Sequence, residues 1–339
     1  MKSNYLLMAV AGLLFLLGCS KEEFQMEGDF FYLKSKDAVM PVWVKGHKAS
    51  NIFIILLHGG PEGGSSQYYT VFPSHQKIEE RFAVVYWDQR MCGMSQGNPS
   101  MADATLDQFT EDLHKLIQVI NEKYDHPELF LMGHSWGGAL GTNYLLEYAS
   151  DIKGWIEIDG GHNWTTANAL SRDSMMHYAQ NKVNEGDEAA YWNFALDWYR
   201  EHPVVGINDN AHYSFVGAAH GYDYNPESDS LQVPFTDLLF FSPISTAYFF
   251  VPYQFSFLEE GLDLQDRLHE IAIPALLCWG KHDGVFPLPV AFDTYGKLGT
   301  AQADKYLRVF DQSAHSPNYE QPMEFAHEVI RFVEQYAYY

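Results

Sequence analysis

Residues 129–138 read LFLMGHSWGG, in which four apolar residues run directly into a serine that stands between glycines. A G-x-S-x-G pattern that follows a buried strand and precedes a helix holds its serine in a sharp turn. Gly133 and Gly137 suit such a turn, because residues without a Cβ let the strand and the helix approach closely. The hydroxyl of Ser135 is therefore predicted to stand at the edge of a sheet, at the start of a helix whose free N–H groups favour developing negative charge.

Short apolar runs like this one recur along the chain, each bounded by Gly, Pro or Asp. They occupy residues 52–57, 82–87, 129–132, 155–158, 275–279 and 306–310. Continuous runs of this length are typical of strands that are buried on both faces of a parallel sheet. Two earlier runs, 30–33 and 40–44, predict a hairpin at the start of the sheet.

Helical patterns separate these runs. In residues 106–120 the apolar side chains recur every three or four positions, which predicts an amphipathic helix, and Thr105 is a suitable N-terminal cap. Residues 140–148 and 323–333 show similar patterns. The alternation of strands and helices predicts a three-layer α/β domain.

One long segment, residues 162–261, interrupts this alternation. It has few strand-like runs and contains aromatic helical stretches such as residues 191–199. Because strand patterns resume directly afterwards, we interpret the segment as a helical cap inserted into an α/β core of residues 30–161 and 262–339. Ligands of open α/β folds bind at the carboxyl ends of the strands, so the cap is expected to cover that edge.

The composition of the chain limits its partners. Its 339 residues include 21 Lys and Arg against 44 Asp and Glu, which gives a formal net charge of −23. Such a surface repels phosphate backbones, so no nucleic-acid partner is expected. No CxxC motif or His-rich ligand spacing is present, so no metal site is predicted. The Gly-rich segment 58–64 lacks a Walker-type lysine, which argues against a phosphate-binding loop.

The first residues have the character of a targeting segment. Lys2 precedes an apolar run over residues 5–17, which is too short for a comfortable membrane span but fits a signal-peptide core. The sequence LLGC that ends at Cys19 resembles the lipobox of bacterial lipoproteins. We expect a signal peptide over 1–18, a lipid on Cys19, a tether over 19–29, and a protein anchored in the cell envelope, with an ordinary secretory signal as the alternative.

A serine nucleophile needs a base and a carboxylate that orients the base. In this architecture the three follow in the order serine, acid, histidine. Asp283 and His315 follow the last two predicted strands and are the candidates. Asp159, after the strand ending at residue 158, is the rival acid. His282 and His327 are the rival bases, and the helical pattern around His327 favours a structural role for it.

Two backbone N–H groups are expected to bind the oxyanion. One belongs to Trp136, the residue after the nucleophile. The other should come from the Gly-rich loop after residue 57, where we assign Gly60, with Gly59 as the alternative. His134, beside the nucleophile, is interpreted as structural, with its side chain directed elsewhere.

Several motifs together resemble the prolyl iminopeptidase group of α/β-hydrolases. They are HGGP (58–61), WDQRMCGMS (87–95), GHSWGG (133–138), GKHD (280–283) and SAH (313–315). The resemblance implies an α/β-hydrolase fold with a mostly parallel central sheet, flanking helices and an inserted helical cap. It also implies a serine peptidase that releases an N-terminal residue, often proline, from short peptides without a cofactor.

The sequence departs from that group where the substrate's amine is held. The group uses cap carboxylates, one of them in a Glu-Asn-His-Tyr-type segment, and no such segment is present here. Glu62 or Glu201 are the candidates to replace it, against the interpretation of each as a solvated surface charge. An esterase or amidase for small apolar acyl groups and a non-catalytic binding lipoprotein remain as alternative functions, and the oligomeric state is left open.

Overall fold

A mixed β-sheet organises the part of the chain that the structure, a computed structural model, describes: residues 29–60, 64–206, 209–225 and 262–338. The strand order is β1-β2-β4-β3-β6-β7-β8-β9, and the short β5 pairs with β2. The strands are β1 (Asp29–Ser35), β2 (Ala38–Gly46), β3 (Ile52–Leu57), β4 (Ala83–Trp87), β5 (Gln96–Gly97), β6 (Glu128–His134), β7 (Gly154–Ile158), β8 (Ala275–Gly280) and β9 (Lys305–Phe310).

The directions of the strands follow from their connections. β1 and β2 form the predicted antiparallel hairpin, in which Phe31 stands opposite Val42. β2 is also antiparallel to β4. The neighbours from β4 to β9 are parallel, as expected for strands joined through helices. The carboxyl ends of β3, β6, β7, β8 and β9 therefore meet at one edge.

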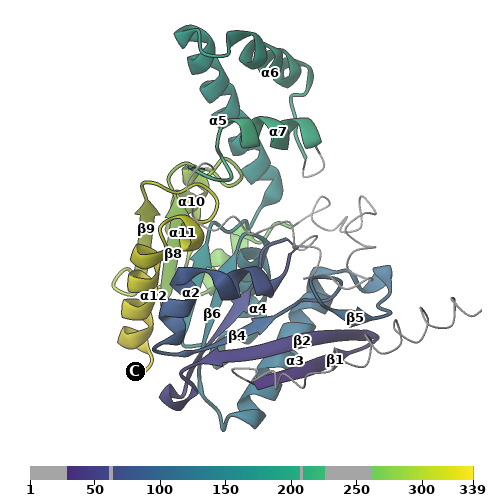
Figure 1. Ribbon diagram of the computed structural model, residues 1–339, viewed down its shortest axis with the longest axis vertical. Helices are drawn as coiled ribbons and strands as arrows, with labels where there is room; N and C mark the ends of the chain where they lie inside the picture. Colours follow the sequence, from purple (N-terminus) through teal and green to yellow (C-terminus); the bar gives the residue numbers. More distant parts are fainter. Residues whose placement is uncertain (1–28, 61–63, 207–208, 226–261, 339) are drawn as a thin grey trace, which may run out of the picture.

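Helices cover both faces of the sheet (Figure 1). They are α2 (Pro73–Glu79), α3 (Leu106–Lys123), α4 (Trp136–Tyr148), α10 (Leu288–Lys297), α11 (Pro317–Glu320) and α12 (Pro322–Tyr336). In β3 the side chains of Ile52, Ile54 and Leu56 share a core with α2 and α12, whereas Phe53, Ile55 and Leu57 share the other core with α3 and α4. This division confirms that the apolar runs are strands buried on both faces.

Three more helices lie beyond one end of the sheet, at the top of Figure 1. They are α5 (Trp164–Glu185), α6 (Ala189–Glu201) and α7 (Asn210–Ala218), and we call them the helical layer. They fall within the predicted cap, of which residues 207–208 and 226–261 lie outside the described residues.

The predicted three-layer α/β architecture is confirmed. The run predicted over residues 52–57 coincides with β3, and the other predicted strands agree within a few residues. The hydroxyl of Thr105 accepts a hydrogen bond from the N–H of Gln108, as expected for the cap of α3. The predicted signal peptide, Cys19 and nearly all of the tether lie outside the described residues. Within the described ranges no helix has the length and apolarity needed to cross a membrane.

Candidate active site

Ser135 stands in the sharp turn that its glycines predicted. Its backbone has φ 55° and ψ −116°, in the left-handed half of φ space that residues with a Cβ rarely adopt. A Cβ on Gly137 would come within 2.0 Å of the carbonyl oxygen of Leu57. The N–H of Ser135 donates to the carbonyl of Ile158, over 2.9 Å, which fixes the turn to the neighbouring strand.

The structure brings Ser135, His315 and Asp283 into one hydrogen-bonded line. Nε2 of His315 lies 3.0 Å from Oγ of Ser135, and Nδ1 lies 2.9 Å from Oδ2 of Asp283. His315 and Asp283 are only 9% and 4% exposed. Because a carboxylate accepts, Nδ1 carries the proton, and the lone pair of neutral Nε2 faces the serine hydroxyl. This geometry suits a general base beside a nucleophile.

Asp283 is itself held by backbone donors. Its Oδ1 accepts the N–H groups of Val285, at 2.7 Å, and Phe286, at 3.0 Å. One oxygen of Asp283 therefore faces the imidazole of His315, and the other fixes the orientation of the loop after β8, which we call the acid loop.

The rival residues take other places. Asp159 is fully buried, and its Oδ1 accepts the N–H of Gly280. Burial, together with the nearby charge of Asp283, raises the pKa of Asp159 well above its usual value. His282 contacts the carbonyl of Asp311, and His327 is exposed on α12.

A histidine-rich cluster adjoins the line. Ring nitrogens of His134 and His315 and a carboxylate oxygen of Asp159 lie within 4.8 Å of one another, close enough to suggest a metal site. Each ring nitrogen already has a protein partner, however: Tyr69 and the carbonyl of His315 for His134, Asp283 and Ser135 for His315. The sequence predicted a structural role for His134 and did not single out Tyr69.

Gln89, from the WDQR motif, links the Gly-rich loop after β3 to Trp136, the first residue of α4. Its side-chain oxygen accepts the indole N–H of Trp136 at 2.8 Å, and its side-chain nitrogen donates to the carbonyl of His58 at 3.1 Å. Its backbone N–H donates to Nε2 of His58. The motif, noticed in the sequence only through a resemblance, thus holds the Gly-rich loop against the helix of the nucleophile.

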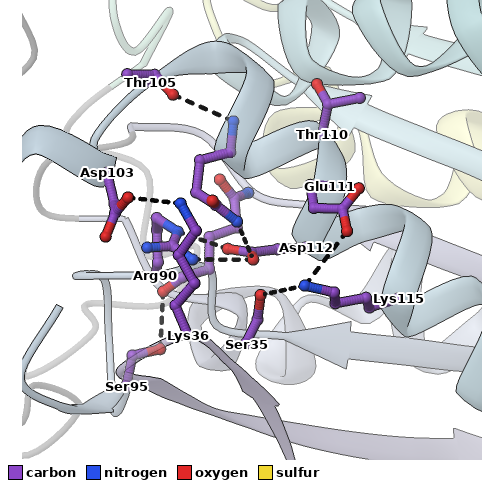
Figure 2. A network of polar contacts seen from close by, with 12 residues as sticks. Ser35, Lys36, Arg90, Ser95, Asp103, Thr105, Thr110, Glu111, Asp112 and Lys115 are labelled. Atoms are coloured by element: carbon purple, nitrogen blue, oxygen red, sulfur yellow. Dashed lines mark hydrogen bonds and ion pairs between the residues drawn. The ribbon is translucent and has the colours of Figure 1, made fainter.

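Arg90, the next residue of the motif, anchors this region to α3 (Figure 2). Its guanidinium group makes two hydrogen bonds to the carboxylate of Asp112, at 2.6 and 2.9 Å, and both side chains are fully buried. Gln108 donates to the same carboxylate. A bidentate pair of this kind fixes both position and orientation.

A cavity of about 480 Å³ opens in front of Ser135. Its lining residues are mostly small or aromatic: Gly59, Gly60, Gly64, Ser65, Tyr68, Tyr69, His134, Ser135, Trp164, Tyr213, Tyr222, Val285 and His315. Within the described part of the chain, this lining contains no carboxylate. Glu62 lies outside the described residues, and Glu201 is exposed at the end of α6, away from the lining.

The helical layer holds a second serine–histidine pair. Oγ of Ser171 contacts Nε2 of His212 at 3.0 Å and also donates to the carbonyl of Gly284. Since the serine gives its proton to that carbonyl, Nε2 of His212 must donate, so no lone pair is available to activate Ser171. This buried pair ties the helical layer to the acid loop.

The comparison with known protein families agrees with this geometry. A family model described as the alpha/beta hydrolase fold matches residues 52–322. The chain belongs to the α/β hydrolase family. Along this hydrolase, Ser135, Asp283 and His315 follow strands β6, β8 and β9 in that order.

Similar proteins include peptidases and esterases. The hydrolase is 34% identical to a proline iminopeptidase of Saccharolobus solfataricus over 302 residues, which cover 85% of this chain and 86% of that protein. It is 26% identical to a probable aminopeptidase, YbaC, of Bacillus subtilis, over 85% of this chain and 91% of the relative.

Solved structures share the fold at lower identity. A proline iminopeptidase of Mycobacterium smegmatis superposes with a TM-score of 0.62 at 17% identity, over 91% of this chain and 99% of the other. An esterase of Exiguobacterium antarcticum superposes with a TM-score of 0.59 at 18% identity, over 89% and 98% of the two chains. These likenesses concern the fold.

Proposed function

We propose that this protein is a serine hydrolase in which Ser135 is the nucleophile, His315 the general base and Asp283 the acid that orients the base. The observation that carries the proposal is the unbroken line of contacts, 3.0 Å from Ser135 to His315 and 2.9 Å from His315 to Asp283. Folding alone does not require these three residue types at three loops that follow three different strands.

The reaction would proceed through an acyl-enzyme. His315 takes the proton of Ser135 while Oγ forms a bond to the substrate carbonyl carbon, and Asp283 stabilises the resulting imidazolium. The oxyanion would be bound by the backbone N–H groups of Trp136 and Gly60. His315 then gives its proton to the leaving amine as the C–N bond breaks, and a water molecule, activated by the same imidazole, hydrolyses the ester.

An active-site probe tests this assignment. A fluorophosphonate phosphonylates an activated serine, so the wild-type protein should be labelled and Ser135→Ala should not. The matched control is Ser171→Ala, which removes the buried serine of the helical layer and should leave a labelled protein. Absence of labelling of the wild type, or equal labelling of Ser135→Ala, would overturn the proposal.

For the substrate we propose a short peptide from which the N-terminal residue, proline among others, is released. The support is the similarity to proline iminopeptidases and to a probable aminopeptidase along most of both chains. Glu62 remains the candidate for holding the free amine, because Glu201 lies away from the cavity lining. Turnover of proline arylamide, with loss of turnover after Glu62→Gln, is the expected result.

One observation favours a second candidate, an esterase or amidase for small apolar acyl groups. The described lining of the cavity presents Trp164, Tyr213 and Tyr222 and no carboxylate to pair with a substrate ammonium group. Aromatic walls suit an apolar acyl chain. Strong hydrolysis of p-nitrophenyl acetate without any hydrolysis of proline arylamide would select the esterase and reject the peptidase.

We also propose that the protein is exported and lipid-anchored through Cys19. The support is the LLGC sequence after an apolar run of signal-peptide length. Metabolic labelling with a palmitate analogue should mark the wild-type protein but not Cys19→Ala. If both proteins remain unlabelled and are recovered free of membranes, the anchor is excluded.

A further inference from the structure

A chain of hydrogen bonds runs beneath the cavity, from the Gly-rich loop to the loop of His315. The N–H of Gly59 lies 3.0 Å from the hydroxyl oxygen of Tyr69. That oxygen lies 2.8 Å from Nδ1 of His134, and Nε2 of His134 lies 2.7 Å from the carbonyl oxygen of His315. Tyr69 and His134 are only 6% and 9% exposed.

The position of each proton in this chain follows by elimination. The carbonyl oxygen of His315 can only accept, so Nε2 of His134 carries a proton. Burial lowers the pKa of His134 to about 3, so the ring is neutral and its Nδ1 is an acceptor. The hydroxyl of Tyr69 therefore donates to Nδ1, and its oxygen accepts the N–H of Gly59. Every link has one donor and one acceptor.

These hydrogen bonds join three parts of the site. Gly59 belongs to the loop after β3, His134 ends β6, directly before Ser135, and His315 lies on the loop after β9. Gly59 is also packed closely here, since a Cβ on it would come within 3.1 Å of Nδ1 of His134 and 3.4 Å of the Cβ of Ser135. A small movement of Gly59, His134 or His315 would therefore displace the other two residues.

We propose that Tyr69 and His134 are positioning residues, which hold the base loop and the Gly-rich loop in register with Ser135; this inference rests on the serine hydrolase function proposed above. The bond to its carbonyl fixes the backbone of His315 on one side. On the other side the N–H of that same residue donates to the carbonyl of Tyr222. Hydrogen bonds therefore hold both the backbone N–H and the backbone C=O of His315.

The same arrangement bears on the oxyanion site. The N–H of Gly59 is directed to Tyr69 and is not available to a substrate oxygen. Gly60, whose φ of 123° is accessible mainly to glycine, is left as the loop's candidate donor. The hydrogen-bonded chain would therefore orient the Gly-rich loop so that the N–H of Gly59 is bound by Tyr69 and the N–H of Gly60 can turn toward the cavity.

Two substitutions at position 134 separate the two bonds of the ring. In His134→Gln the side-chain amide can replace Nε2 as donor to the carbonyl of His315 but cannot also receive the hydroxyl of Tyr69 as Nδ1 does. In His134→Asn the amide oxygen can replace Nδ1 as acceptor but does not reach the base loop. Tyr69→Phe removes the hydroxyl from the middle of the chain.

The expected effects are on kcat rather than on KM. A displacement of about 1 Å in a reacting group can cost on the order of a hundredfold in rate. We expect Tyr69→Phe and His134→Asn to lower kcat by about ten- to a hundredfold with KM changed by less than about threefold. His134→Gln should recover a large part of that loss, and the rate of fluorophosphonate labelling should fall in parallel with kcat.

A matched control is available outside the cavity. Tyr144 on α4 contacts Nδ1 of His114 at 3.5 Å, and neither residue lines the cavity. Tyr144→Phe removes the hydroxyl of this second tyrosine–histidine pair and should leave kcat unchanged. Thermal unfolding of each variant shows whether it is folded at the assay temperature.

Two outcomes would overturn the positioning role. One is wild-type kcat and labelling rate in folded Tyr69→Phe and His134→Asn. The other is a loss in His134→Gln as large as that in His134→Asn. Failure of the proposed function itself would look different, because the wild-type protein would then resist fluorophosphonate.

Discussion

Gly221 and Gly284 lie against each other at the junction between the helical layer and the acid loop. The N–H of Gly284 donates to the carbonyl of Gly221 over 3.0 Å. A Cβ on Gly284 would come within 3.0 Å of Cα of Gly221, and one on Gly221 within 2.9 Å of Cα of Gly284. Gly284 follows Asp283 directly, so this backbone contact, like the hydrogen bond from Ser171 to Gly284, couples the position of the helical layer to that of Asp283.

Gly284→Ala is therefore expected to damage catalysis as well as stability. The added methyl group must push the two backbones apart and shift Asp283 from His315, so we expect kcat to fall by at least about tenfold. Gly296→Ala on α10 is the control, because a Cβ there meets nothing within 4 Å. That variant should be as active as wild type and more stable by about 0.5–1 kcal/mol. Wild-type kcat in Gly284→Ala would show that the junction does not control the acid.

The choice between the two candidate acids can be tested directly. Asp283→Asn removes the carboxylate that orients His315, and losses of about ten-thousandfold in kcat are typical of that change. Asp159→Asn resembles the protonated carboxyl group that burial favours at this position, so we expect its kcat to stay within about tenfold of wild type. The measurement is steady-state turnover with unfolding curves for both variants. Comparable losses in the two would contradict the assignment of Asp283 as the acid.

The buried pair of Arg90 and Asp112 should matter for stability. Removing one partner leaves the other charge buried and unpaired, which typically costs about 3–5 kcal/mol. We therefore expect Asp112→Asn to lower the free energy of unfolding markedly, as measured by denaturation in urea. Glu270→Gln, which breaks the exposed pair between Arg267 and Glu270, should have no measurable effect. Equal effects of the two substitutions would refute this prediction.

His75 should make the fold sensitive to acid. Neither ring nitrogen of this fully buried side chain has a hydrogen-bond partner among the residues that the structure describes, and burial lowers its pKa from 6.5 to about 3. The unfolded chain binds a proton below pH 6.5 while the folded state does not, so stability is lost as the pH falls from 6.5 toward 3.

His75→Phe removes this titration. Its stability relative to wild type should rise by about 1.4 kcal/mol for each pH unit below 6.5, and should not change above pH 7.5. Urea denaturation at pH 7.5 and 5.5 gives the two differences. An identical difference at both pH values would mean that His75 does not stay neutral in the folded state.

Much of the fold could be predicted because its strands are buried on both faces. Burial on both faces forces each strand to be apolar throughout, and the run at residues 52–57 stands out for that reason. Ser135 could be found because its turn requires Gly137. Asp283 and His315 could be found because loops after parallel strands converge at one edge of the sheet.

Other features depended on contacts that no local pattern contains. Asp159 and Asp283 both follow the ends of strands and both are buried, so only their contacts distinguish them: Asp283 meets His315, and Asp159 accepts the N–H of Gly280. Tyr69 lies in a short 3-10 helix (Ser66–Val71) that no apolar periodicity announces, and its partner His134 is far away in the sequence. The charge of Glu201 made it a candidate, but the end of α6 carries it away from the cavity lining.

His315, the proposed base, follows β9, the outermost described strand on its side of the sheet. β9 pairs with β8 and with no other described strand, and its loop delivers His315. During synthesis Ser135 and Asp283 emerge before His315, and the imidazole of His315 reaches them only when β9 pairs with β8. A truncated chain that ends after β8 would thus lack a proton acceptor for Ser135, and hydrolysis would report on completed assembly of the sheet.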